Sequence, residues 1–227
     1  MLLTIIIPVY NEKSTVVEVI EKVASIELPL EKEIIVVDDG SNDGTKELIE
    51  SKQIHLARFY STPVNIGKGA AVRIGLTFAK GDIILLQDAD LETNPDEYLS
   101  LLQPILDKKT SVVYGSRFLN PTNKVPRIRR LANWGLTKTT NVLFRSRLTD
   151  METAYKVFTK EVAQKLTLRS NRFDIEPEIT SRICQAGFKI LEVPISYNPR
   201  TVFEGKKIKF RDGLKAIWTL VKCRFDF

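Results

Sequence analysis

The chain has 227 residues, of which 43% are hydrophobic and 27% charged, the balance of an ordinary globular protein with a sizeable core. With one histidine and two isolated cysteines it lacks the ligands for zinc, haem or iron–sulfur sites, so any metal must be held by oxygen. No apolar run approaches the roughly 18 residues of a membrane-spanning helix, and residues 2–10 lack the flanks of a secretion signal, so we expect a cytosolic protein.

The net charge of +6 is unevenly distributed along the chain. Residues 1–109 contain 11 basic and 18 acidic residues, whereas residues 110–149 contain 8 basic and no acidic ones. Residues 199–227 contain 8 basic and 3 acidic ones. Two basic blocks on an acidic body predict an anionic partner, namely a nucleic acid, a membrane surface or a phosphorylated acceptor. The alternative is a solvated basic face without a partner.

The first half of the chain alternates β-rich and helical patterns. Strands are expected at 3–7, 33–37, 56–61, 82–87 and 111–115, and helices at 15–24, 45–51, 69–79 and 95–107. This alternation predicts an α/β fold with a parallel sheet between helices. Two of the strands are apolar on both faces, which is typical of central strands covered on both sides.

The second half of the chain is more basic and less regular. Three closely spaced arginines, Arg127, Arg129 and Arg130, precede an expected helix through Trp134 and Val142. A strand near 154–158, a helix at 175–185 and a strand near 190–195 follow. The tail has apolar residues at intervals of four, three and four, which predicts an amphipathic helix with the stripe Phe210, Leu214, Ile217 and Val221.

Acidic residues follow two of the expected central strands, where ligands bind in open α/β sheets. After the strand expected at 82–87, alternation along an extended chain places Asp88 and Asp90 on the same side. Such a pair repels itself unless a cation lies between, and Mg²⁺ binds through one or two carboxylates together with substrate phosphates. The sequence therefore predicts a divalent metal site, with Glu92 as a third oxygen donor; a solvated acid pair in a turn is the alternative.

Two further segments suit a nucleotide. A carboxylate of Asp38 or Asp39, which follow the strand expected at 33–37, could accept hydrogen bonds from a base or from ribose hydroxyls. Gly67, Lys68 and Gly69 open a helix, where free N–H groups favour an anion, although a tight turn with close helix packing explains the glycines equally well. The dinucleotide-binding fingerprint and the Walker A loop are both missing.

Taken in order, five segments resemble the inverting glycosyltransferases of family 2, which have the GT-A fold: residues 6–12, 37–41, 65–69, 88–91 and 115–117. Residues 149–151, 173–178 and 192–207 look like the polyprenyl-phosphate sugar synthases, the dolichyl-phosphate mannose synthase group. The resemblance covers nearly the whole chain. It implies one GT-A domain over 1–227, a Rossmann-like, mixed and mostly parallel sheet between helices. Within it, 1–116 would bind the nucleotide sugar, 117–209 the acceptor, and 210–227 would form the amphipathic C-terminal helix.

The resemblance also implies a donor, a GDP- or UDP-linked sugar. Its expected contacts are Pro8, Tyr10, Glu12, Asp38, Asp39, Lys68, Asp88, Ala89 and Asp90. Asp88, Asp90 and Glu92 would hold Mg²⁺ or Mn²⁺ on the diphosphate. Many relatives have Gln at the position of Glu92. The membrane-spanning tail of many relatives is missing here, so we expect peripheral attachment on the cytoplasmic face of a membrane.

The expected acceptor is a polyprenyl or dolichyl phosphate. Its second pKa is near 6 by analogy with phosphorylated side chains, so it arrives largely ionised and a strong base is dispensable. Asp150, which aligns with the family's candidate base, then positions rather than deprotonates, and Arg117 is the second expected catalytic residue. A hydroxyl acceptor on a soluble glycan would instead make Asp150 the essential base. The cations available for an acceptor phosphate are Arg117, Arg129, Arg130, Arg200, Lys206 and Lys207.

The regions around Trp134 and Trp218 are the expected membrane-docking elements, because basic amphipathic helices bind anionic surfaces. Alternatively, the Trp218 stripe packs on the protein itself or forms a homo-oligomer contact. A nucleotidyltransferase would carry a Gly-rich basic loop after the first strand, where residues 8–12 stand instead. A nucleic-acid-binding protein would leave the acidic strand ends unexplained, so no nucleic acid is expected as a partner.

Overall fold

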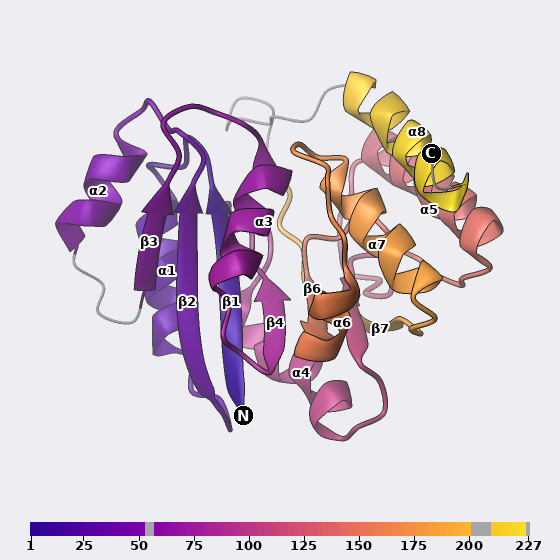
Figure 1. Ribbon diagram of the computed structural model, residues 1–227, viewed down its shortest axis with the longest axis horizontal. Helices are drawn as coiled ribbons and strands as arrows, with labels where there is room; N and C mark the ends of the chain where they lie inside the picture. Colours follow the sequence, from indigo (N-terminus) through magenta and orange to yellow (C-terminus); the bar gives the residue numbers. More distant parts are fainter. Residues whose placement is uncertain (53–56, 201–209, 226–227) are drawn as a thin grey trace.

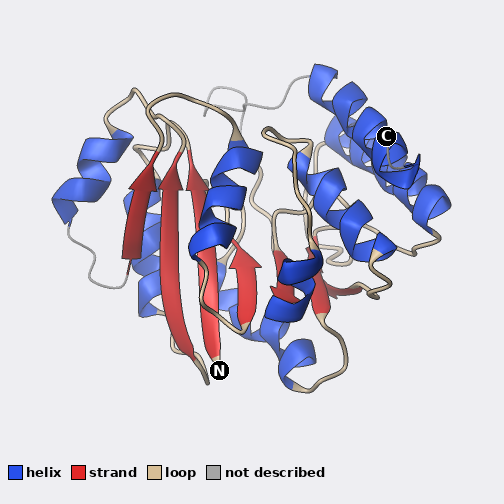
Figure 2. Ribbon diagram, viewed as in Figure 1, coloured by secondary structure: helices blue, strands red, loops and turns tan. Residues whose placement is uncertain are grey.

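The computed structural model describes residues 1–52, 57–200 and 210–225 and shows a single sheet between two layers of helices (Figures 1 and 2). The strand order in the sheet is β3-β2-β1-β4-β6-β5-β7. The strands are β1 (Leu2–Val9), β2 (Glu31–Asp38), β3 (Ala57–Ser61), β4 (Ile83–Leu86), β5 (Val112–Ser116), β6 (Lys156–Thr159) and β7 (Leu191–Pro194). The predicted α/β class is therefore confirmed.

Pairing within the sheet is parallel except at β6. Strand β1 runs parallel to β2 and to β4, β2 runs parallel to β3, and β5 runs parallel to β7. Strand β6 is antiparallel to both of its neighbours, β4 and β5. The sheet is thus mixed and mostly parallel, as expected, and its single reversed strand joins the two halves of the chain.

Helices cover both faces of the sheet (Figure 2). One hydrophobic cluster joins β1 to α1 and α4, and a second, on the other face, joins β1 and β4 to α3, α6 and α7. Strand β1 contributes Leu3, Ile5 and Ile7 to one cluster and Ile6 to the other, as a central strand with side chains on alternating faces must. The helices are α1 (Val16–Ser25), α2 (Thr45–Lys52), α3 (Lys68–Phe78), α4 (Tyr98–Leu106), α5 (Arg127–Phe144), α6 (Lys160–Lys165), α7 (Ile175–Gln185) and α8 (Phe210–Phe225).

The structure differs from the expected elements in three places. Strand β4 ends at Leu86, so the alternation premise fails for Asp88 and Asp90, which lie in the turn after the strand. The helix expected at 95–107 begins with a 3₁₀ turn, η1 (Pro95–Glu97), whose cap is the side chain of Asn94. Helix α6 was not predicted, because its six residues are too few to show a periodic pattern.

The tail forms the expected amphipathic helix, and it packs against α5 and α7 (Figure 1). Its buried face consists of Ala216, Leu220 and Cys223. The predicted apolar stripe is not part of this buried face: Leu214 is 56% exposed and Ile217 is 42% exposed. Helix α8 therefore has two apolar faces, one packed on the protein and one open to solvent.

A close helix–strand contact gives a stability prediction. A Cβ added at Gly75 of α3 would collide with the buried side chain of Ile6 on β1, whereas a Cβ added at Gly135 of α5 would meet no atom within 4 Å. We expect Gly75→Ala to destabilise the protein, because overpacking costs about 1–3 kcal/mol and the gain in helix propensity is only about 1 kcal/mol. Gly135→Ala should stabilise it by about 0.5–1 kcal/mol. Chemical denaturation of both variants checks this, and equal unfolding midpoints would refute the contact.

Candidate active site

Acidic residues gather at the edge of the sheet where the parallel strands end. The arrowheads of β1, β2 and β3 point to the same edge in Figure 2, and the predicted nucleotide-binding residues lie at the ends of β1 and β2, after β4 and at the start of α3. Pro8 and Ala89 are buried there, and Tyr10 is half-buried. Glu12 is only 7% exposed. The topology therefore brings segments that are far apart in sequence to one place.

The buried acids Asp38 and Asp39 shape the loops at this edge. Asp39 accepts hydrogen bonds from the backbone N–H groups of Ile66 (2.9 Å) and Gly67 (2.6 Å). Burial nevertheless raises the pKa of Asp39 above its usual value. Asp38 accepts a hydrogen bond from the backbone N–H of Ser41 at 3.1 Å. Both carboxylates thus have protein partners, and direct contact with a nucleotide stays a prediction.

The two acids of the predicted metal site meet after β4 although the strand ends before them. Burial, followed by the negative charges of Asp88 and Glu92, raises the pKa of Asp90 to about 7, against the opposing effect of Arg200. Leu91 adopts a left-handed conformation (φ 57°) in this turn. The carboxylates therefore converge through a turn and repel one another, a donor set that suits a divalent cation shared with a diphosphate.

Protein cations already contact these carboxylates. Lys68 Nζ lies 2.7 Å from Asp88 Oδ1 and 2.8 Å from Glu176 Oε1. Arg200 Nη2 lies 3.4 Å from Asp90 Oδ2, and both of its terminal nitrogens bind Glu12, at 2.8 and 3.1 Å. The negative charge of the edge is thus neutralised from within the chain.

Glu92 has several protein partners at the place where a third metal ligand was expected. Its carboxylate accepts hydrogen bonds from the Tyr197 hydroxyl (3.0 Å) and the Arg200 backbone N–H (2.8 Å), and Arg129 Nη1 lies 3.4 Å away. Within the described residues, no group of three or more Asp, Glu, His or Cys side chains is arranged to hold a metal. Glu92 anchors the chain at Tyr197 and Arg200, and its role as a metal ligand stays a prediction without support in the geometry.

The acceptor-side arginines gather around Tyr197. Arg117 lies over the Tyr197 ring, 5.2 Å from its centroid, and Arg129 Nη1 lies 3.1 Å from the Tyr197 hydroxyl. Arg129 also donates a hydrogen bond to the backbone carbonyl of Arg200 at 2.9 Å. Arg130 is exposed and lines a small cavity of about 60 Å³ with Arg117. The other two predicted cations, Lys206 and Lys207, lie outside the described residues.

Asp150 is completely buried and holds Arg117. Its carboxylate accepts two hydrogen bonds of 2.7 Å from the guanidinium and one of 3.0 Å from the Arg117 backbone N–H. Burial alone would lower the pKa of Arg117, but Asp150 more than offsets this and raises it. A carboxylate engaged in this way fixes the orientation of the arginine, and its role in the reaction stays a prediction.

Sequence reasoning missed a buried ion-pair network behind the site. Lys156 of β6 is fully buried, and its Nζ lies 2.5 Å from Glu176 Oε2, while Lys68 contacts the other Glu176 oxygen. The available signal was a lysine inside the apolar strand pattern of residues 154–158, since a buried lysine needs a carboxylate partner.

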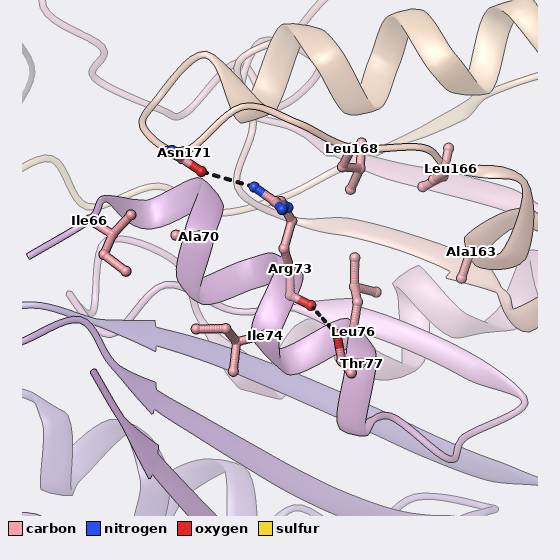
Figure 3. A pocket seen from close by; sticks show the side chains of 10 residues that line it. All are labelled: Ile66, Ala70, Arg73, Ile74, Leu76, Thr77, Ala163, Leu166, Leu168 and Asn171. Atoms are coloured by element: carbon pink, nitrogen blue, oxygen red, sulfur yellow. Dashed lines mark hydrogen bonds between the residues drawn. The ribbon is translucent and has the colours of Figure 1, made fainter. Parts of the chain in front are cut away.

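A separate cavity of about 550 Å³ lies on the outer side of α3 (Figure 3). Leu76, Leu166 and Leu168 line it, and Arg73 crosses it to donate a hydrogen bond to Asn171 Oδ1 at 2.9 Å. None of the predicted site residues lines this cavity.

Comparisons with known proteins agree with this arrangement. The sequence model of the family described as Glycosyl transferase family 2 matches residues 4–167. The dolichyl-phosphate beta-glucosyltransferase ALG5A of Trichomonas vaginalis is 28% identical over 97% of this chain and 72% of its own length. The dolichyl-phosphate beta-glucosyltransferase ALG5C of the same organism is 30% identical over 99% of this chain and 71% of its own length.

Solved structures show the same fold. The crystal structure of glucosyl-3-phosphoglycerate synthase from Mycobacterium tuberculosis with UDP has a TM-score of 0.76, at 20% identity, covering 98% of this chain and 80% of its own. A complex of the same enzyme with Mn²⁺, UDP-glucose and phosphoglyceric acid has a TM-score of 0.74, at 20% identity, covering 98% of this chain and 79% of its own.

The raised pKa of Asp90 gives a pH prediction. Because a metal binds the ionised carboxylate, protons compete with it, and the affinity for Mn²⁺ alone should rise as the pH increases from 6 to 8 and level off above the pKa of about 7. Electron paramagnetic resonance titration with Mn²⁺ measures this. Asp96→Asn, at an exposed acid nearby, should behave as wild type. An affinity that does not change across this range would contradict the assignment of Asp90.

Proposed function

We propose that this chain, which belongs to glycosyl transferase family 2 and has the GT-A fold, transfers a hexose from a nucleotide sugar to a polyprenyl phosphate at an anionic membrane surface. The observation that carries the proposal is the direct contact between the donor-side acids and the acceptor-side arginines. Arg200 touches Asp90 and Glu12, and Arg129 touches Glu92. The names of the two Trichomonas relatives support a lipid phosphate as the acceptor.

The donor half of the proposal rests on Asp88 and Asp90. These residues would hold Mg²⁺ or Mn²⁺ together with the donor diphosphate. When bound, the metal offsets the negative charge that develops on the departing nucleoside diphosphate. Lys68, fixed between Asp88 and Glu176, adds a positive charge beside the same group.

In the acceptor half, the residues of the chain hold an anion rather than remove a proton. A phosphate oxygen of the lipid attacks the anomeric carbon from the face opposite the leaving diphosphate, and the bond from that carbon to the diphosphate oxygen breaks. Arg117, Arg129 and Arg200 would hold the acceptor phosphate close to the acidic edge, where it would otherwise be repelled. Asp150 keeps Arg117 in place.

A second candidate acceptor is a soluble phosphorylated molecule. The solved complex with phosphoglyceric acid, on the same fold, favours it, and the three arginines would suit either phosphate. The two candidates differ in whether the acceptor is presented by a membrane.

The surface formed by α5 and α8 supports membrane docking. The two helices lie side by side (Figure 1), and the exposed apolar residues on them are Ile128, Leu131, Trp134, Val142, Leu214, Ile217, Trp218 and Phe225. Exposed basic residues flank them, namely Arg127, Arg130, Lys138, Lys215 and Lys222. An apolar patch bordered by basic residues fits the interface of an anionic bilayer. Within the described part of the chain, none of the helices has the length and hydropathy to span a membrane.

The activity test uses a panel of UDP- and GDP-sugars with Mn²⁺ or Mg²⁺, with and without polyprenyl phosphate. We expect sugar transfer that requires both the metal and the lipid phosphate.

Asp88→Asn should reduce the transfer rate at least about a hundredfold, because it removes a carboxylate at the developing charge. Asp150→Asn should lose less, since asparagine still accepts a hydrogen bond from Arg117. Equal losses at saturating metal would contradict a positioning role for Asp150, and transfer only to soluble phosphates would select the second candidate.

A matched pair of leucines tests the docking surface. Leu131 on α5 is 68% exposed, and Leu99 on α4, outside the α5/α8 surface, is 48% exposed. We expect Leu131→Glu to weaken binding to anionic vesicles about tenfold, because it removes apolar burial and adds a repelled charge. Leu99→Glu should bind as wild type. Sedimentation with phosphatidylserine-containing vesicles at low and high salt measures this, and no binding by the wild type would remove the membrane from the proposal.

A further inference from the structure

Two buried side-chain atoms beside the active site have no hydrogen-bond partner. They are the amide nitrogen of Asn133, a residue of α5 that is 6% exposed, and Oε1 of Glu152. The two residues adjoin, because the Glu152 backbone N–H points to Asn133 Oδ1 at 3.4 Å. A buried polar group without a partner costs about 1–3 kcal/mol, so the pair points to an occupant.

The chemistry of the two atoms defines this occupant. An amide nitrogen can only donate hydrogen bonds, and an ionised carboxylate oxygen can only accept them. A hydroxyl group does both, so a hydroxyl is the one group that could serve either atom. The occupant need not be charged, since the charges of Arg117, Lys156, Asp150 and Glu176 already act on Glu152.

The charge environment of Glu152 agrees with an unmet polar group. Burial, then the charge of Glu176, raises its pKa to about 7, against the opposing charges of Lys156 and Arg117, while Asp150 adds to the rise. An incoming hydroxyl would donate to this carboxylate and supply the hydrogen bond that it lacks.

The position of the pair identifies the hydroxyl. Asp150, two residues before Glu152, holds Arg117, the arginine expected to bind the acceptor phosphate. The backbone carbonyls of Met151 and Thr153, the two neighbours of Glu152, accept hydrogen bonds from Lys156. Lys156 contacts Glu176, which Lys68 joins to Asp88 at the expected place of the donor diphosphate. In a direct transfer, the sugar occupies the space between the attacking phosphate and the leaving diphosphate. Glu152 and Asn133 therefore border the place of the transferred sugar.

We propose that Glu152 and Asn133 bind one hydroxyl of the transferred hexose and so determine which sugar the enzyme accepts. The proposal rests on the nucleotide-sugar half of the proposed function and does not depend on the nature of the acceptor. It adds two specificity-determining residues that neither the strand-end pattern nor the basic blocks predict.

The test compares the binding of a nucleotide sugar with that of the bare nucleoside diphosphate. Titration calorimetry with UDP-glucose, UDP, GDP-mannose and GDP, each with Mn²⁺, first identifies the donor that the wild type binds. Glu152→Ala and Asn133→Ala should each weaken binding of that nucleotide sugar about tenfold and leave the nucleoside diphosphate unchanged, because one buried hydrogen bond to the sugar is lost. Glu152→Gln, which keeps an acceptor oxygen, should recover most of the affinity.

Controls separate the outcomes. Glu161→Ala, at an exposed glutamate of α6, should bind both ligands as wild type. Among deoxy analogues of the donor sugar, the one that lacks the bound hydroxyl should bind the wild type and Glu152→Ala with equal affinity. Variants that bind the nucleotide sugar like wild type would mean that only water occupies the pair, and equal losses for both ligands would mean a structural role; either result overturns the inference. If the wild type binds no nucleotide sugar, the proposed function fails as well. Should Glu152→Ala not fold, Asn133→Ala carries the same test.

Discussion

Repulsion among carboxylates at one edge of the sheet is the constraint on which the rest of the structure depends. Parallel strands end at the same edge, and in this chain acids stand at or shortly after the ends of β1, β2 and β4. Each acid is stabilised by a cation or by backbone N–H groups: Asp88 by Lys68, Glu12 and Asp90 by Arg200, and Asp39 by Ile66 and Gly67. Asp88 and Asp39 thus have their partners in the first half of the chain, whereas Glu12 and Asp90 depend on Arg200 from the basic second half.

The same pairing joins the site to the core. Lys68 and Lys156 share the two oxygens of Glu176, so the first turn of α3, strand β6 and the first turn of α7 are joined by buried charges. Breaking one partner of such a group leaves a buried charge uncompensated, at a cost of about 3–5 kcal/mol. The ion pairs that neutralise the acidic edge thus also join it to the core.

The fold and the place of the site could be predicted from the sequence because both depend on local patterns. Apolar runs mark β2 and β4, and the acids after them mark the ligand edge. The partners of those acids could not be predicted, since Arg200 meets Glu12 across 188 residues of sequence and Lys156 meets Glu176 only because β6 runs antiparallel. The alternation argument for Asp88 and Asp90 failed because the strand ends at Leu86, so that both residues lie in the turn that follows it.

Protein cations hold the acidic edge, and bound metal and diphosphate should replace the contact of Arg200 with Asp90. The most direct measurement is a crystal structure with Mn²⁺ and a nucleoside diphosphate. We expect Mn²⁺ on Asp88 and Asp90, with the Arg200 guanidinium no longer in contact with Asp90. Metal and diphosphate bound elsewhere, with the contacts of Lys68 to Asp88 and of Arg200 to Asp90 unchanged, would contradict this expectation.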